Sequence, residues 1–331
     1  MAELITNQLP MGRRPPHPEE THPRLHLGDF LTATATISVP PVVDYLFSVP
    51  QFPMFGNDRI GDCTAAAAAH MREVWTAYGQ GTATVTTDAD VLAFYELCSG
   101  YNPADPSTDR GAVMQDCLDA WRKTGLAGDK ILAFFQINQA DLAEVKAALY
   151  MLGGNYVGIN FPRSAMAQFN AGQPWSFDPN ADNTIIGGHC VHLGAVDANG
   201  LMKVTTWGRT QVVTADWWNR FVEECWGVAS GDWIHNYQAP NGLDTGKLNS
   251  AFFQITKGQP GPFPEAPAPV PVPTPPAPVD HNRELWKVAQ PWTQRWHVPG
   301  SDTDRVSKAL TVWGKATFPT GIDTTRQETV R

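Results

Sequence analysis

The densest run of proline is the feature that most constrains what this chain can fold into. Ten of its 28 prolines fall between Pro260 and Pro278, where they alternate mostly with Ala and Val. Proline has a fixed φ and no backbone N–H, so such a run favours an extended polyproline II rod over a helix or a sheet. We therefore expect residues 257–280 to be a semi-rigid linker. A proline-rich ligand for a partner protein is the alternative.

The linker divides the chain into segments of different character. Residues 39–256 hold most of the periodic apolar sequence, and we expect them to form the main domain. Residues 1–38 contain prolines at 15, 16, 18 and 23, so they are expected to be an irregular arm. The arm also carries His17, His22 and His26, but no Cys or second ligand cluster accompanies them, so we expect no metal site.

Residues 281–331 are a short segment with four tryptophans at 286, 292, 296 and 313. Ser301–Asp304 resembles a helix start, and Val306, Leu310 and Trp313 follow at helical spacing. About fifty residues rarely bury a core of their own. We expect a partly helical element that anchors the protein to a large assembly or a cell wall, or else a helix that packs back onto the main domain.

Composition excludes several classes of protein. The net charge of −9 over 331 residues argues against nucleic-acid binding, which needs clustered Lys and Arg. No apolar run approaches the ~20 residues that span a membrane, and the N-terminus lacks a secretory signal. We expect the protein in the cytoplasm of the cell that makes it, or within a virion. The five cysteines form no CxxC pair, so neither a disulfide scaffold nor a zinc site is expected, and nothing indicates a cofactor.

The main domain reads as α+β. We predict helices at Thr64–Tyr78, Ala89–Cys98, Val113–Thr124 and Gln139–Leu152 from apolar spacing and the glycines that follow most of them. We predict strands at Tyr156–Asn160, His189–Asp197, Met202–Trp207 and Gly231–His235. Helices precede strands, which favours two separate layers or lobes over alternating βαβ units.

Cys63 lies at the start of the first predicted helix, directly after Gly61 and Asp62. Backbone N–H groups and the positive end of the helix dipole stabilise a thiolate there. Negative charge on Asp62 opposes this effect, although Asp62 could serve as the helix N-cap. The alternative is that Cys63, beside an alanine run, is a small buried apolar residue.

A nucleophilic thiolate needs an imidazole to activate it and to protonate the leaving group. His189 and His192 are candidates, and their spacing of three places them on opposite faces of a strand. His189 follows Gly187 and Gly188, where the backbone can approach another lobe closely. His192 is interpreted as a structural histidine.

Three segments resemble the papain-like cysteine peptidases in order and spacing. Val43-Asp44-Tyr45 resembles the family's Val-Asp-Trp, and Asn57 precedes Cys63 by the family's Gln-to-Cys spacing. Residues 109–126 are similar to its Gly-containing loop and helix. His189 stands at the family's distance before Trp207-Gly208. The sequence around Cys63 resembles a divergent bacterial and phage branch of the superfamily.

The resemblance implies a two-lobe fold with a helical lobe and an antiparallel β lobe. It implies Cys63 as nucleophile, His189 as base and acid, and Asn57 as an oxyanion donor with the Cys63 backbone N–H. Trp207 would shield the histidine. Thr205 stands where the family has the Asn that orients the histidine, which puts turnover in question more than fold.

Two functions of different class follow from the resemblance. The first is a cysteine peptidase or amidase that cleaves a protein or a cell-wall peptide. The second is a catalytically weak or inactive protein with the same fold, which serves as a structural or binding component of a phage particle. Alkylation of Cys63 ahead of the other four cysteines would favour the first.

Overall fold

The computed structural model describes residues 9–22, 24–29, 38–243, 245–255 and 261. The chain divides into two compact units, Met1–Ala266 and Pro267–Arg331. The predicted C-terminal element and all of the predicted linker except Gly261 lie outside the described residues, so both stay predictions.

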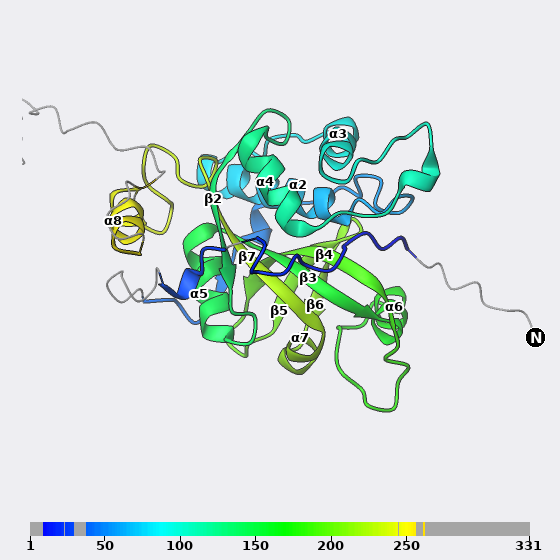
Figure 1. The fold of residues 1–331 in the computed structure, drawn as a ribbon. Helices are drawn as coiled ribbons and strands as arrows, with labels where there is room; N and C mark the ends of the chain where they lie inside the picture. The colour runs from blue at the N-terminus through cyan, green and yellow to red at the C-terminus, as the bar shows by residue number, and fades with distance from the viewer. Residues whose placement is uncertain (1–8, 23, 30–37, 244, 256–260, 262–331) are drawn as a thin grey trace, which may run out of the picture. The chain divides into compact units, whose positions relative to one another are not determined.

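The described part of the first unit is α+β. Its helices are α2 (Cys63–Gln80), α3 (Asp88–Ser99), α4 (Met114–Lys123), α5 (Leu142–Leu152), α6 (Arg163–Asn170), α7 (Ala215–Phe221) and α8 (Thr245–Ile255), with short 3-10 turns η1 (Leu46–Ser48) and η2 (Pro106–Thr108). Figure 1 shows α2, α3 and α4 grouped on one side of a sheet, as the two-lobe prediction requires. No helix within the described ranges combines the length and the apolar character needed to cross a membrane.

The β lobe is an antiparallel sheet of seven strands in the described residues. Its order is β2-β7-β3-β4-β5-β6, and β1 pairs with the end of β4. The bounds are β1 Val43–Asp44, β2 Ile131–Ile137, β3 Asn155–Pro162, β4 Ile185–Val196, β5 Met202–Thr206, β6 Arg209–Val213 and β7 Val222–Ser230. β3 and β4 are the central pair, and α2 packs against β4. This packing brings the start of α2 to the middle of the sheet.

The predicted helices are present, with ends decided by capping. α2 continues to Gln80 because Gly81, at φ 78°, is the residue that adopts the left-handed turn. α5 begins at Leu142 instead of Gln139 because the Asp141 side chain accepts hydrogen bonds from the first turn.

Two predictions about strands are wrong. Residues 231–234 form a turn and a bend, and His235 makes only an isolated bridge with Gln238, because the strand of that region, β7, ends at Ser230. β2 lies between α4 and α5, so helices and strands are not fully segregated along the chain. The burial of β2 alternates with the period of two that is typical of a strand with one covered face. β2 was nevertheless not among the predicted strands.

Candidate active site

Cys63 is the first residue of α2 and lies against the strand that carries His189. Its side chain is 1% exposed. Burial raises the pKa of the Cys63 thiol to about 12; the backbone N–H groups of Cys190 and Gly12 oppose the shift, and the charge of Asp62 adds to it. The predicted thiolate is therefore absent from the covered site. The helix terminus is in place, but loss of solvent outweighs its stabilising effect.

His189 is fully buried on β4, and its ring is held from two sides. Its Nε2 lies 2.6 Å from Oγ1 of Thr206. The indole of Trp207 stacks on the ring with a centroid separation of 4.1 Å and an interplanar angle of 14°. Trp207 thus covers one face of the imidazole. Nδ1 has no hydrogen-bond partner within the described residues.

The environment of His189 favours the neutral imidazole. Burial, and after it the charge of the nearby Arg13 guanidinium, lowers the pKa of His189 to about 3. A neutral ring that donates from Nε2 to Thr206 presents an unprotonated Nδ1. That is the form a general base requires.

The structure corrects the assignment of Thr205 to His189. Thr205 pairs with His192 in the β4–β5 register, and its Oγ1 lies 3.2 Å from the Nδ1 of His192. Thr206 takes the place at His189 because neighbouring residues of a strand point to opposite faces. His192 is fully buried on the other face, in line with a structural role.

Asn57 and Asp62 belong to the loop that leads into α2, and both are buried. The amide of Asn57 donates to the carbonyl of Ile60 at 3.4 Å, a long hydrogen bond. Asp62 occupies the N-cap position, yet its side chain makes no capping hydrogen bond. Burial raises the pKa of Asp62 to about 8. The amide of Asn57 lies nearby and opposes this rise without a hydrogen bond of normal geometry to the carboxylate.

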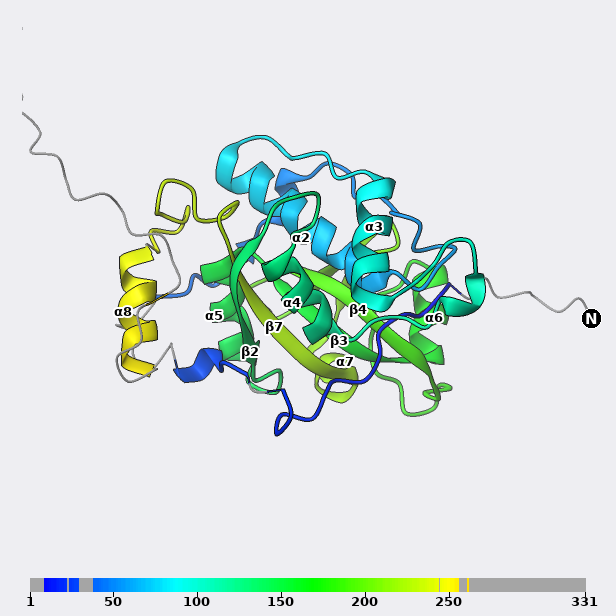
Figure 2. The same cartoon turned by 45° about the horizontal axis from the view of Figure 1, so that its top comes forward.

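The N-terminal arm runs through the site. Here the arm means its described residues 9–22. The N–H of Arg13 donates to the carbonyl of Gly188 at 2.9 Å, directly before His189. Ala112 donates to the carbonyl of Gly12 at 2.8 Å and accepts from the N–H of Arg14 at 2.9 Å. Figure 1 shows this dark-blue segment crossing β7, β3 and β4, and Figure 2 shows it from a second side.

Glycines make this close passage possible. A Cβ on Gly12 would lie 1.6 Å from the carbonyl oxygen of Gly61, and one on Gly188 would lie 2.1 Å from that of Arg13. A Cβ on Gly111 would likewise lie 2.1 Å from the carbonyl oxygen of Gly12. Such distances are far below van der Waals contact, so only glycine fits. The arm therefore covers Cys63 through close backbone contacts that a side chain at any of these glycines would prevent.

Sequence reasoning recognised an irregular arm but did not place it in the site. The signal lay in glycine: Gly12 occurs between prolines, Gly61 precedes Cys63, and Gly187 and Gly188 precede His189. Glycine clusters of this kind indicate close backbone approach. They do not say which segment approaches, and that required the tertiary structure.

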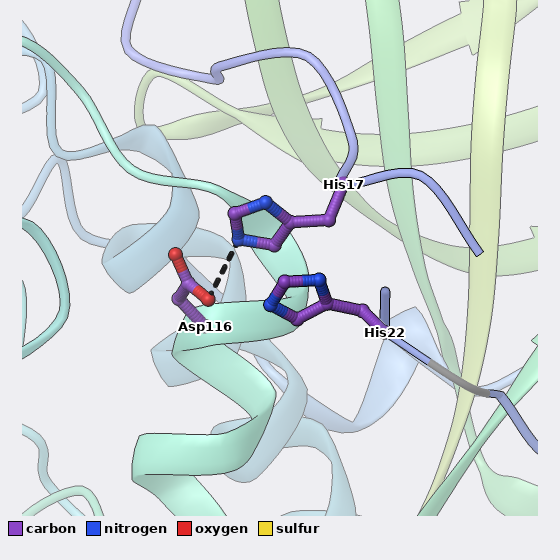
Figure 3. A group of neighbouring side chains, drawn as sticks. All are labelled: His17, His22 and Asp116. Carbon is purple, nitrogen blue, oxygen red and sulfur yellow. Dashed lines mark hydrogen bonds and ion pairs between the residues drawn. The ribbon is translucent and has the colours of Figure 1, made fainter. Parts of the chain in front are cut away.

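A second cluster of polar side chains joins the arm to α4. Nε2 of His17 lies 2.9 Å from Oδ1 of Asp116, and the rings of His17 and His22 stack at a centroid separation of 3.9 Å (Figure 3). Their ligand atoms lie within 4.8 Å of one another, so a cation could bind there. The hydrogen bond and the ring stack account for the arrangement without one.

Structural comparison finds similar solved proteins, among them several cysteine proteases. Xylellain, a cysteine protease from Xylella fastidiosa, matches with a TM-score of 0.50 and 14% identity, over 67% of this chain and 96% of that one. Bromelain from Ananas comosus, in complex with the E64 inhibitor, matches with a TM-score of 0.43 and 13% identity, over 58% of this chain and 100% of that one.

A procathepsin B from Trypanosoma congolense matches with a TM-score of 0.46 and 13% identity, over 68% of this chain and 86% of that one. No family model matches the sequence. No curated protein matches it either.

Proposed function

Because this chain has the fold of the papain-like cysteine proteases, we propose that it is a cysteine peptidase or amidase with Cys63 as nucleophile and His189 as general base and acid. One observation carries the proposal. The Nε2 of His189 is held by Thr206, its Nδ1 is unpartnered within the described residues, and the next residue, Cys190, directs its N–H to the Cys63 thiol. An oriented imidazole beside a cysteine at a helix terminus is the arrangement that activates a thiol.

The chemistry proceeds in two steps. His189 takes the thiol proton, and Cys63 sulfur bonds to the substrate carbonyl carbon. The C–N bond then breaks, and the proton passes from the imidazolium to the departing amine. Water, deprotonated by His189, attacks the thioester carbon, the S–C bond breaks, and the imidazolium returns its proton to the Cys63 sulfur. The product leaves as a carboxylic acid, which ionises in water. The Cys63 backbone N–H and the Asn57 amide, once released from Ile60, donate to the oxyanion.

The arm must leave before a substrate can enter. Gly12 lies against the Cys63 thiol, and the thiol is covered in this arrangement. We propose that the structure is a closed form of the enzyme, and that displacement of residues 11–14 hydrates Cys63 and lowers its pKa. The helix terminus then acts on a solvated sulfur and stabilises its anion, as helix starts do for bound anions in general.

The second candidate is a binding or structural protein that keeps the fold without turnover. The closed site favours it, because the arm is fixed over Cys63 by backbone hydrogen bonds on both sides. In this case the arm never leaves, and residues 281–331 provide the contact with an assembly or a cell wall.

Labelling with a peptidyl epoxide separates the two candidates. The test compares the wild type with Gly12→Val, whose side chain cannot fit beside Gly61 and must expel the arm. A peptidase predicts rapid modification of Cys63 in Gly12→Val, slow modification in the wild type, and none after Cys63→Ala.

Gly231→Val is the matched control, since a Cβ there meets nothing within 4 Å. It should label as the wild type does. If Cys63 in folded Gly12→Val reacts no faster than Cys98, which is partly exposed, the peptidase proposal is wrong.

A further inference from the structure

The side chain of Arg13 fills a closed pocket beside the site. Only 1% of it is exposed. Nη1 donates to Oε1 of Glu224 at 2.8 Å, and Nη2 donates to Oδ1 of Asn160 at 2.8 Å and to Oε2 of Glu223 at 2.5 Å. We call Asn160, Glu223 and Glu224 the acidic pocket. It holds one guanidinium between two carboxylates and an amide oxygen.

The acidic pocket belongs to the sheet and not to the arm. Asn160 lies on β3, and Glu223 and Glu224 lie on β7, its hydrogen-bonded neighbour. Glu224 is 1% exposed, and its second oxygen accepts a hydrogen bond from the indole N–H of Trp226 at 2.9 Å. The carboxylate is therefore oriented by a rigid element, independently of Arg13.

A glycine on β3 leaves the room that the guanidinium stem needs. A Cβ at Gly158 would lie 2.6 Å from Cγ of Glu224 and 2.8 Å from Cδ of Arg13. Any larger residue at this position would close the pocket. The site is thus shaped for a long side chain as well as charged for a cation.

The donor and acceptor pattern selects arginine. Three oxygen acceptors from different residues converge, and a planar guanidinium offers five N–H donors in a fixed fork. An ammonium is a compact charge and reaches fewer of these oxygens at once. A neutral side chain would leave the buried Glu224 without a counter-charge, which is costly.

Along the arm, the residue that fills the acidic pocket directly follows the residue that contacts the Cys63 sulfur. Gly12 directs its N–H to the Cys63 thiol, and the next residue, Arg13, bonds through its N–H to the carbonyl before His189. A peptide that replaces the arm along the same backbone groups places a side chain over the acidic pocket.

From this placement we propose that the acidic pocket is the specificity pocket of the enzyme, that it selects peptide substrates by an arginine side chain, and that Arg13 occupies it in the closed form. This inference rests on the proposed function. It adds the substrate class: peptides with an arginine next to a small residue.

Peptide binding in trans tests the proposal. The protein is the full chain carrying Gly12→Val, Arg13→Ala and Cys63→Ala, so the arm is expelled, the pocket is emptied and nothing is cleaved. The probes are dye-labelled hexapeptides of Gly and Ala with one arginine, or its neutral analogue citrulline, at each position in turn. Fluorescence anisotropy measures the Kd.

We expect arginine at one position to bind at least about tenfold more tightly than citrulline there. Adding Glu224→Gln, which keeps the shape and the acceptor for Trp226, should remove this difference. Adding Arg14→Ala, which changes an exposed arginine of the arm, should not. Circular dichroism confirms that each variant is folded.

Equal binding of arginine and citrulline peptides at every position would overturn the proposal and leave the acidic pocket as an anchor for the arm. A preference that survives Glu224→Gln would overturn it as well. Neither result bears on the peptidase proposal, because epoxide labelling of Cys63 reads that separately and this experiment needs no turnover.

Discussion

At the scale of the residue, a single step along β5 decides the environment of the candidate base. Thr205 and Thr206 are adjacent and chemically identical, yet only Thr206 contacts His189, because strand neighbours face opposite sides. Its hydroxyl takes the place of the orienting Asn amide of the papain-like family, a position that the resemblance had assigned to Thr205. A hydroxyl can accept from Nε2 but also rotates, so it holds the ring less firmly than an amide.

Thr206→Val should separate these two threonines. The change keeps the shape and leaves the buried Nε2 of His189 without an acceptor, at a cost of about 1–3 kcal/mol. In the Gly12→Val background we expect the rate of Cys63 labelling to fall roughly tenfold or more. Thr205→Val, which removes a hydroxyl that hydrogen-bonds to His192 and not to His189, should leave the pH profile of labelling unchanged. An equal effect of both changes would refute the assignment.

Asp62 offers a second test at this scale. Burial raises its folded pKa to about 8, above the value of about 3.9 for an unfolded aspartate, so its protonated form is favoured on folding. The folded state therefore loses stability as pH rises from about 4 to 8. Asp62→Asn should add roughly 2–5 kcal/mol to the free energy of unfolding at pH 8 and little at pH 4. Urea denaturation at both pH values measures this, and equal gains would contradict it.

At the scale of the element, the arm behaves as an extra strand laid across the junction of the two lobes. Arg13 forms an isolated parallel bridge with Ala112 on one side and bonds to Gly188 on the other. Backbone hydrogen bonds hold its direction, and the ion pairs of Arg13 hold its register. The arm is thus an element whose docking controls access to Cys63.

Arg13→Ala should loosen the arm, whereas Arg14→Ala should not. Truncating Arg13 leaves Glu224 buried without its counter-charge. The free energy of arm docking should therefore become less favourable by about 2–5 kcal/mol. Alkylation of Cys63 by iodoacetamide should become at least about tenfold faster. Arg14 is exposed, so its removal controls for the loss of one positive charge. Similar rates in the two variants would show that the arm is held by its backbone alone.

At the scale of the whole molecule, buried histidines set the acid limit of stability. Burial lowers the pKa of His70 to about 4 and of His192 to about 3, as it does for His189. The unfolded value is about 6.5, so their contribution is complete above that pH and is lost as pH falls toward 4 and 3. We expect these three histidines to lower the unfolding midpoint as pH falls below about 6.5, against the opposite contribution of Asp62.

A matched pair of variants tests whether the buried histidines cause the loss of stability in acid. His192→Gln should flatten the loss of the unfolding midpoint between about pH 6.5 and 4, because one buried site no longer takes up a proton on unfolding. His235→Gln changes an exposed histidine and should leave the slope as in the wild type. Thermal melts at several pH values measure both, and parallel slopes for all three proteins would refute the explanation.

The local pattern of the sequence determined much of the main domain. Capping residues, glycine stops and apolar spacing predicted α2 to α5, because these signals act within a few residues of each other. The same local signals identified Cys63 at a helix start and His189 on a strand, the two residues on which the proposed chemistry depends. Strands β2, β6 and β7 were missed and residues 231–235 were misassigned, since sheet neighbours are distant in sequence.

Only the tertiary structure decided what surrounds these residues. Arg13 and Glu224 are separated by 211 positions, and no local signal predicts their ion pair. The same holds for the placement of the arm, for the choice of Thr206 over Thr205, and for the raised pKa of Cys63. A helix terminus favours a thiolate by local geometry, whereas burial depends on every segment that covers the sulfur, so the fold and not the motif sets the state of the site.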